Sequence, residues 1–244
     1  MADFLRPQSV GDILTNTFSI YGRGFIAICL TYFLPLFPVT LWQTETRVAG
    51  AMGLYWLGFL VSIFASLFAF GAITVAVSDL VLGNRPSVAR SYGRVFSGSM
   101  FMRLFGASLL QALFIGVGFI LLVIPGLIAV MWLLFTPAVV VLEGLGGMNA
   151  LKRSKALGQG FNWRNVGVFL LMIVIGGVFG GIVGGLFGLL FPGSLGTFAH
   201  RLLLSAIQLL TGPVSLIAIV LMYYDLRVRK EAYDAAALAE DLRR

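Results

Sequence analysis

Residues 166–190 read VGVFLLMIVIGGVFGGIVGGLFGLL, an apolar run without a single charged side chain. At 1.5 Å of rise per residue, a helix of this length exceeds the roughly 30 Å hydrocarbon core of a bilayer. In water, each glycine inside such a helix would cost about 1 kcal/mol relative to alanine. In lipid the backbone must hydrogen-bond to itself, so the helix is enforced and its glycines become contact surface. The stretch therefore predicts a membrane-spanning helix.

Glycines recur along this run at every fourth residue, in two adjacent rows. On a helix both rows are expected on one face, which without Cβ atoms forms a groove for another helix backbone. We predict a helix-packing seam there, and three interpretations stay open: packing within one subunit, a homo-oligomer seam, or a ligand groove. The seam consists of Gly176, Gly177, Gly180, Gly181, Gly184, Gly185 and Gly188.

The composition of the whole chain agrees with this stretch. Of 244 residues, 59% are hydrophobic and 11% charged, and the mean hydropathy is +0.98. Such values indicate an all-α integral membrane protein with several spans. The single cysteine, Cys29, allows no disulfide within the chain and has no zinc-type spacing. Residues 1–8 lack the pattern of a cleaved signal peptide, so we expect the first apolar segment to persist as a span.

Apolar runs predict six transmembrane helices in a single membrane domain, residues 1–244. Three short amphipathic segments, which begin at Ser9, Ser87 and Asn149, are expected to lie in the membrane interface. The third is basic and is expected to extend to Arg164. An amphipathic segment followed by two spans occurs three times, which we interpret as three degenerate helix-plus-hairpin repeats. The expected spans are residues 24–42, 53–77, 104–124, 126–142, 166–190 and 202–222, with a charged cytoplasmic tail at 223–244.

The third and fourth predicted spans are unusual because no polar loop separates them. They meet at Pro125-Gly126. The fourth span has only about 17 residues, which is the lower limit for crossing a bilayer. Two full spans and a re-entrant or kinked hairpin over residues 104–142 therefore stay as alternatives.

Basic residues are distributed unevenly between the two predicted sides of the membrane. Fifteen of the 17 Lys and Arg residues fall on one side, and only Arg47 and Arg201 lie opposite. The positive-inside rule then places both termini in the cytoplasm of a bacterial-type inner membrane. This asymmetry accounts for the net charge of +7 without nucleic acid as a partner.

Motifs of known catalytic, cofactor or metal chemistry are absent from the sequence. It has no phosphate loop, HExxH or GxSxG motif, and its one histidine, His200, cannot hold a metal alone. Glu143 ends the fourth predicted span, and we expect it to form a rim ion pair with Arg153 rather than act as a catalytic acid. We therefore expect no enzyme activity, cofactor or metal.

Transport is a second interpretation. Ion-coupled carriers usually keep ionisable residues near the midplane, but no Asp or Glu lies at the centre of a predicted span. The polar candidates are neutral residues of types that often hydrogen-bond between helices: Gln111, Gln208, Thr31, Ser108, Ser205 and Thr211. Gln111 and Gln208, together with kinks at Pro125, Pro137 and Pro213, keep a small cavity open as an alternative.

Basic residues on the third amphipathic segment and after the last span form the candidate lipid-headgroup site. Each such cation near an anionic leaflet contributes about 1 kcal/mol. The alternative is topology charge without a defined lipid site. Tyr223 and Tyr224, at the end of the last span, are expected in the aromatic belt of the interface. The candidate headgroup residues are Lys152, Arg153, Lys155, Arg227, Arg229 and Lys230.

Five short motifs, in order along the chain, carry a family resemblance. They are RPQSVGDIL at 6–14, IPG at 124–126, VLEG at 141–144, ALKRS at 150–154 and YYDLRVRKE at 223–231. In these motifs the chain resembles the glycerophosphoryl diester phosphodiesterase membrane domain family, although Lys155 stands where that family often has Trp. The resemblance implies a helical membrane module near lipid or glycerophosphodiester metabolism. Residues 1–244 hold no counterpart of the catalytic domain to which some members are fused.

The sequence as a whole favours a non-catalytic inner-membrane module. We expect an accessory, scaffold or assembly subunit that contacts anionic lipids and other membrane proteins, as a homo-oligomer or in a larger membrane complex. The alternative is a transporter or channel for a small or lipid-like solute. The third interpretation is the membrane part of glycerophosphodiester or lipid metabolism.

Overall fold

The structure, a computed structural model, describes residues 4–194 and 197–243; the side chains of residues 194 and 208 lie outside the description. Within the described ranges every regular element is a helix, and strands are absent. Six segments are long and apolar enough to cross a membrane. The chain is thus an all-α, multi-pass membrane protein, which confirms the predicted fold class.

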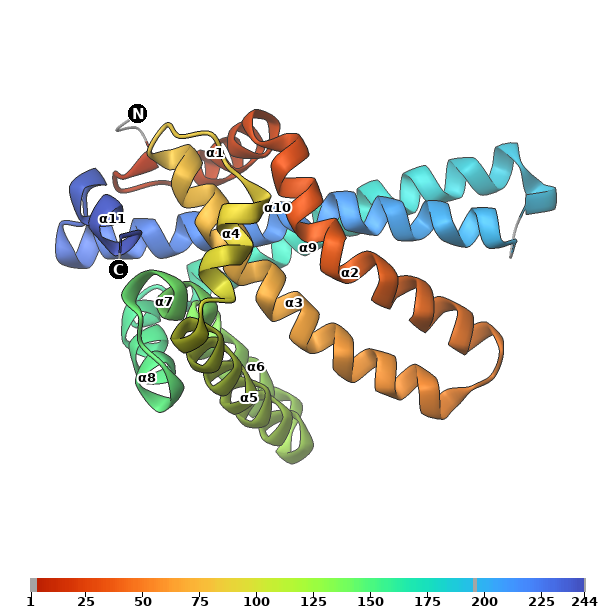
Figure 1. Cartoon of the computed structure of the whole chain (residues 1–244), viewed down its shortest axis with the longest axis horizontal. Coiled ribbons are helices and arrows are strands. Elements are labelled where there is room, and N and C mark those ends of the chain that lie inside the picture. Colours follow the sequence, from red (N-terminus) through yellow and green to blue (C-terminus); the bar gives the residue numbers. More distant parts are fainter. Residues whose placement is uncertain (1–3, 195–196, 244) are drawn as a thin grey trace.

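A short helix followed by a helical hairpin occurs three times along the chain, the order that the sequence predicts (Figure 1). A three-residue 3-10 turn, Pro192–Ser194, lies between the last two long helices. The helices are α1 (Val10–Arg23), α2 (Phe25–Val48), α3 (Met52–Val81), α4 (Val88–Val95), α5 (Gly98–Leu121), α6 (Val123–Leu133), α7 (Thr136–Glu143), α8 (Gly147–Gly158), α9 (Asn162–Leu190), α10 (Phe198–Glu231) and α11 (Ala235–Asp241).

Local capping explains where the short helix α1 begins. The Asp12 N–H donates to the Ser9 hydroxyl at 3.1 Å, and the Ser9 N–H donates to the Asp12 carboxylate at 2.9 Å. This reciprocal pair is a capping box, which satisfies N–H groups that a helix start otherwise leaves unpaired. These hydrogen bonds lower the pKa of Asp12, so its carboxylate is charged at neutral pH. The next helix, α2, continues to Val48, past residue 42, where the first span is expected to end.

The segment expected as a single fourth span, residues 126–142, belongs to two helices. The hairpin closes at Leu122, which is extended at φ −167° and ψ 157°, rather than at the Pro125-Gly126 pair. α6 ends after three turns, and α7 begins afresh with Pro137 in its first turn, where proline is tolerated. All residues of α7 before Glu143 are buried.

The third short helix and the tail also differ from their expected bounds. α8 ends at Gly158, and Gly160, with φ +86°, turns the chain into α9. Arg164, assigned from sequence to the basic amphipathic segment, therefore lies in the first turn of α9. α10 continues from its apolar part to Glu231 without a break, so the tail expected from residue 223 begins as helix.

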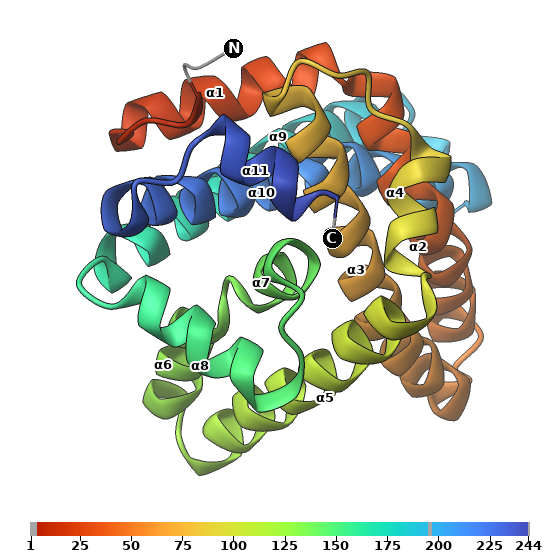
Figure 2. The ribbon, with the colours of Figure 1, turned by 60° about the vertical axis from the view of Figure 1, so that its left-hand side comes forward.

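The short helices gather at one end of the molecule, and we call this region the hub. It comprises α1, α4, α7, α8 and α11 with the adjoining ends of α3 and α10 (Figure 2). Ile13, Ile73, Val140, Leu157 and Tyr224, from five of these helices, are fully buried in a common core.

Three hairpins project from the hub, and two of them pack together. α2 of the first hairpin lies against α10 of the third. Gly212 permits this approach, since a Cβ there would lie 2.5 Å from the ring of Tyr32. Near the far ends of these hairpins, Arg201 pairs with Glu45 at 3.0 Å. The second hairpin, α5–α6, projects in a different direction (Figure 1).

Candidate functional site

Polar and ionisable side chains gather inside the hub, around the end of α10. Tyr223, Tyr224 and Asp225 are fully buried there. The Tyr223 hydroxyl donates to Glu143 of α7 at 2.9 Å, and the Tyr224 hydroxyl lies 2.6 Å from that of Ser78 on α3. The expectation of an aromatic belt is wrong for both tyrosines, because α3 and α7 cover this part of α10.

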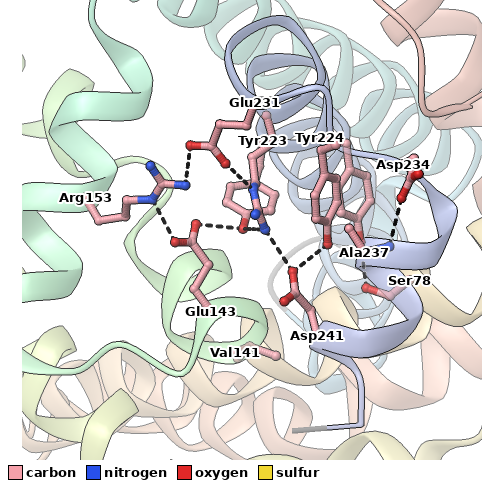
Figure 3. Close-up of polar contacts among 12 residues, drawn as sticks. Ser78, Val141, Glu143, Arg153, Tyr223, Tyr224, Glu231, Asp234, Ala237 and Asp241 are labelled. Carbon is pink, nitrogen blue, oxygen red and sulfur yellow. Dashed lines mark hydrogen bonds and ion pairs between the residues drawn. The ribbon is translucent and has the colours of Figure 1, made fainter.

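A chain of alternating charges, which we call the charge network, joins α7, α8, α10 and α11 (Figure 3). Arg153 pairs with Glu143 at 2.7 Å and with Glu231 at 2.5 Å. Arg227 pairs with the same Glu231 at 2.9 Å and with Asp241 at 2.8 Å. The two residues expected to form a rim ion pair, Glu143 and Arg153, are therefore brought together as one link of a longer network.

Tyrosines and burial stabilise the charge network further. The Tyr233 hydroxyl donates to Asp241 at 2.7 Å, and the guanidinium of Arg227 lies 3.8 Å from the centre of the Tyr233 ring. Burial, with Tyr224 and Asp241 nearby, raises the pKa of Tyr233, so it keeps its proton at neutral pH. Burial alone would lower the pKa of Arg153, but its bonds to two glutamates outweigh burial and raise it. Both groups therefore act as permanent donors.

Asp225 is the centre of a second cluster. Its buried carboxylate accepts a hydrogen bond from the backbone N–H of Gln8 at 2.6 Å and from Arg229 at 2.9 Å, and it pairs with Arg164. The two arginines also donate to the carbonyl of Gln8, at 2.8 Å from Arg229 and 3.3 Å from Arg164. Asp225 thus joins α9, α10 and the segment before α1.

The short helix α4 supplies a third set of contacts. Arg90 pairs with the buried Asp79, at the end of α3, at 3.1 Å. Arg94 donates to the backbone carbonyls of Asp241 and Leu242, each at 2.5 Å. Burial and the neighbouring Arg90 lower the pKa of Arg94, but an arginine stays charged in a protein. α4 therefore connects α3 to α11.

The structure divides the six predicted headgroup residues into two groups. The three arginines form the ion pairs described above, and Lys230 donates to the carbonyls of Ala156 and Gln159, each at 2.8 Å. Lys152 and Lys155, although they lie on α8, take no part in the charge network: among the described residues, neither has an ion pair or a hydrogen bond. Headgroup binding itself stays a prediction.

The glycine ladder of α9 faces in two directions rather than forming one groove. In one row, a Cβ added at Gly176, Gly180 or Gly184 would lie 3.8, 3.7 or 2.8 Å, respectively, from a side chain of α10. In the other row, a Cβ would meet nothing within 4 Å. The first row packs within the chain, so an oligomer seam stays a prediction for the second. The first row holds Gly176, Gly180 and Gly184, with Gly188 half-buried beyond them, and the second holds Gly177, Gly181 and Gly185.

Gly184 and Gly185 are adjacent, but the same substitution should be destabilising at the first and tolerated at the second. Gly184→Leu is expected to destabilise the α9–α10 hairpin by about 1–3 kcal/mol, the usual cost of overpacking, because its Cβ meets Leu204 at 2.8 Å. Gly185→Leu should leave the melting temperature in detergent unchanged. Light scattering of the purified protein shows whether it also reduces assembly size. Equal melting temperatures for the two variants would contradict the assignment of the rows.

Other polar residues singled out from the sequence have structural contacts. Gln111 donates to the carbonyl of Leu133 at 3.1 Å and so joins α5 to α6. The side chain of Gln208 lies outside the description. The ring of His200 stacks on Phe187, with centroids 5.9 Å apart. Within the described residues, no group of three His, Cys, Asp or Glu side chains is placed to hold a metal ion.

Comparison with known families and proteins gives one match. The model of a family described as "Domain of unknown function (DUF7847)" matches residues 27–226. No curated protein and no solved structure matches the chain. The family that the sequence motifs resemble is not confirmed by this match, and that resemblance stays a prediction.

Proposed function

Because the chain belongs to the family described as "Domain of unknown function (DUF7847)", we propose a function from its geometry alone: it is a non-catalytic membrane module. It acts as an accessory, scaffold or assembly subunit that contacts lipids and other membrane proteins. One observation carries this proposal. The α5–α6 hairpin projects from the hub apart from the other two hairpins (Figure 1), and its apolar side chains are exposed along one face.

The uncovered face of α5 extends along most of the helix. Met102, Leu109, Leu113 and Ile120 are all exposed. A continuous apolar face on a membrane helix contacts lipid tails or another helix, and large apolar patches mark interaction surfaces. The face is therefore the proposed contact region.

The hub supports a structural rather than a catalytic role. Its buried or half-buried charges pair with one another, as Glu143 does with Arg153 and Asp225 with Arg229. A hydrolytic site needs an acid, a base or a metal placed to act on a substrate. Release of glycerol phosphate from glycerophosphocholine by the purified chain, abolished by Glu143→Gln, would instead favour the phosphodiesterase interpretation.

One cavity favours the alternative of a transporter or channel for a small or lipid-like solute. It has a volume of about 480 Å³ between α2, α9 and α10, and hydroxyls of Tyr32, Thr211 and Ser215 line it. The alternative predicts that reconstituted protein moves a fluorescent phosphatidylcholine between leaflets, and that Thr211→Val with Ser215→Ala abolishes the movement. Under the module proposal the protein does not accelerate this exchange.

We also propose a bacterial-type inner membrane with both termini in the cytoplasm. The support is charge distribution: the basic residues of the hub lie on one side, and Arg47 and Arg201 lie near the opposite hairpin ends. The positive-inside rule assigns the hub to the cytoplasm.

Photocrosslinking tests the module proposal. A photoreactive residue at Leu113, which is exposed on α5, should form adducts with membrane proteins or lipids in the native membrane. The same residue at Ala107, which is fully buried on α5, should crosslink only within the chain. The proposal fails if Leu113 forms neither protein nor lipid adducts while the protein is folded and inserted.

A further inference from the structure

The basic residues of α8 point to opposite sides of the helix. Arg153 points into the charge network, where it pairs with Glu143 and Glu231. Lys152 and Lys155, which the charge network does not use, are three residues apart and so lie on one face of the helix. Two cations of α8 are therefore left at the surface for an external anion.

The two lysines border an apolar groove of about 440 Å³ between α5, α6 and α8. Phe114, Ile128 and Trp132 are among its walls, and apart from the lysines its lining is apolar. The Nζ atom of Lys155 lies 3.7 Å from the centre of a Trp132 ring. A cation over an indole beside apolar surface is an arrangement suited to the membrane interface.

The hairpin reaches about one leaflet beyond Trp132. The part of α6 that lines the groove, from Trp132 to Pro125, is about 10 Å long, and the hairpin closes at Leu122, about 15 Å from Trp132 along the helix axis. Half of the hydrocarbon core of a bilayer is also about 15 Å. With Lys155 at the headgroups, the turn of the hairpin therefore lies near the middle of the bilayer.

The turn of the α5–α6 hairpin is itself suited to lipid. Two backbone hydrogen bonds cross it: the Leu122 N–H donates to the Gly118 carbonyl at 3.1 Å, and the Gly126 N–H donates to the Leu122 carbonyl at 3.3 Å. The ends of the other two hairpins instead carry the Glu45–Arg201 ion pair. Aliphatic side chains this exposed are costly in water and favourable in lipid. Those at the turn, 64% to 85% exposed, are Ile120, Leu121, Leu122, Val123 and Ile124.

We propose that α5, α6 and α8 bind an anionic phospholipid of the hub-side leaflet, with α5–α6 as a re-entrant hairpin that turns inside the bilayer. The phosphate lies between Lys152 and Lys155, and an acyl chain follows Ile128 and Trp132 toward Pro125. The inference rests on the proposed lipid-contacting function and names its ligand. It selects the re-entrant alternative for the second hairpin, which still returns the chain to the hub side.

Native mass spectrometry of the full chain tests the lipid site. The protein is supplied with equal amounts of phosphatidylglycerol and phosphatidylcholine carrying the same acyl chains. Lys152→Gln combined with Lys155→Gln should reduce the preference for phosphatidylglycerol by a factor on the order of 25, about fivefold for each cation. Neither lysine belongs to the charge network, so the melting temperature should change little.

Two further variants separate the groove from general surface charge. Arg85→Gln with Arg243→Gln removes two exposed cations away from the groove and should preserve the lipid preference. Ala129→Phe fills the groove and should reduce retention of both lipids. The site is refuted if the lysine variant keeps the wild-type preference, or if the arginine control loses as much.

The depth of the hairpin is tested without reference to lipid preference. In a Cys29→Ser background, a spin label at Leu122→Cys should collide with oxygen but not with a water-soluble nickel chelate. Ala49→Cys, at the turn of the first hairpin, should be reached by the chelate and by a membrane-impermeant maleimide. Equal maleimide labelling at both positions would overturn the re-entrant site. Lipid adducts from Leu113 together with an unchanged lysine variant would refute this site alone and leave the module proposal standing.

Discussion

Replacing Asp225 with asparagine is expected to lower the free energy of unfolding by about 3 kcal/mol. Breaking a buried ion pair typically costs 3–5 kcal/mol, because the remaining charge is left uncompensated. Asp225 is fully buried, while Arg164 and Arg229 are 22% and 30% exposed, so water offsets part of the loss. Asparagine preserves the shape of the side chain but leaves two neighbouring guanidinium groups without an anion.

Thermal or denaturant unfolding in detergent, followed by circular dichroism, measures this effect. Asp12→Asn is the matched control, because it makes the same chemical change at an exposed carboxylate that caps α1. Loss of half a capping box should cost about 1 kcal/mol or less. If Asp225→Asn is no more destabilising than Asp12→Asn, the Asp225 cluster does not hold the hub together.

The second large effect is expected from Gly118→Leu, in the α5–α6 hairpin. A Cβ at this position would lie 2.9 Å from the Cα and 3.0 Å from the backbone nitrogen of Gly126. A side chain in the way can rotate aside, but backbone cannot, so the two helices must separate. Overpacking costs about 1–3 kcal/mol and occasionally more, and we expect the upper end of that range.

The control for this change lies two residues earlier on the same helix. A Cβ at Gly116 meets nothing within 4 Å, so Gly116→Leu should be neutral or slightly stabilising, since leucine favours helix more than glycine. Melting temperature in detergent is the primary measurement. Because Pro125, beside Gly126, lines the groove, Gly118→Leu should also weaken phosphatidylglycerol retention. Equal melting temperatures for the two variants would show that the helices are not in close contact.

The sequence predicts the helices well because span length and hydropathy are local properties. Capping is equally local, so Ser9 with Asp12 correctly marks the start of α1. The burial of Asp225 is not local. A charged residue just after an apolar run is as compatible with a water-facing rim as with a core. One of the groups that contact the buried carboxylate is the N–H of Gln8, 217 residues away. Only the position of that distant segment distinguishes the two.

The glycine ladder shows the same limit at shorter range. Successive residues on a helix differ by about 100° in direction, so Gly184 and Gly185 share a broad face but point apart. The location of α10 decides that Gly184 is covered and Gly185 is not. Likewise, the sequence does not decide whether the second hairpin crosses the bilayer or turns inside it. The depth of Trp132 in the bilayer follows from its contact with Lys155 of α8, and that contact is not local in sequence.

The contacts of the hub predict an order of folding. Arg94 binds backbone carbonyls at residues 241 and 242, and Asp225 binds the N–H of Gln8. Contacts between residues so far apart in the chain form late, because the loop between them must first be closed. While α11 is still inside the ribosome, Arg94 therefore lacks the carbonyls of residues 241 and 242. We expect the hairpins to enter the membrane one after another during translation, and the hub to form last.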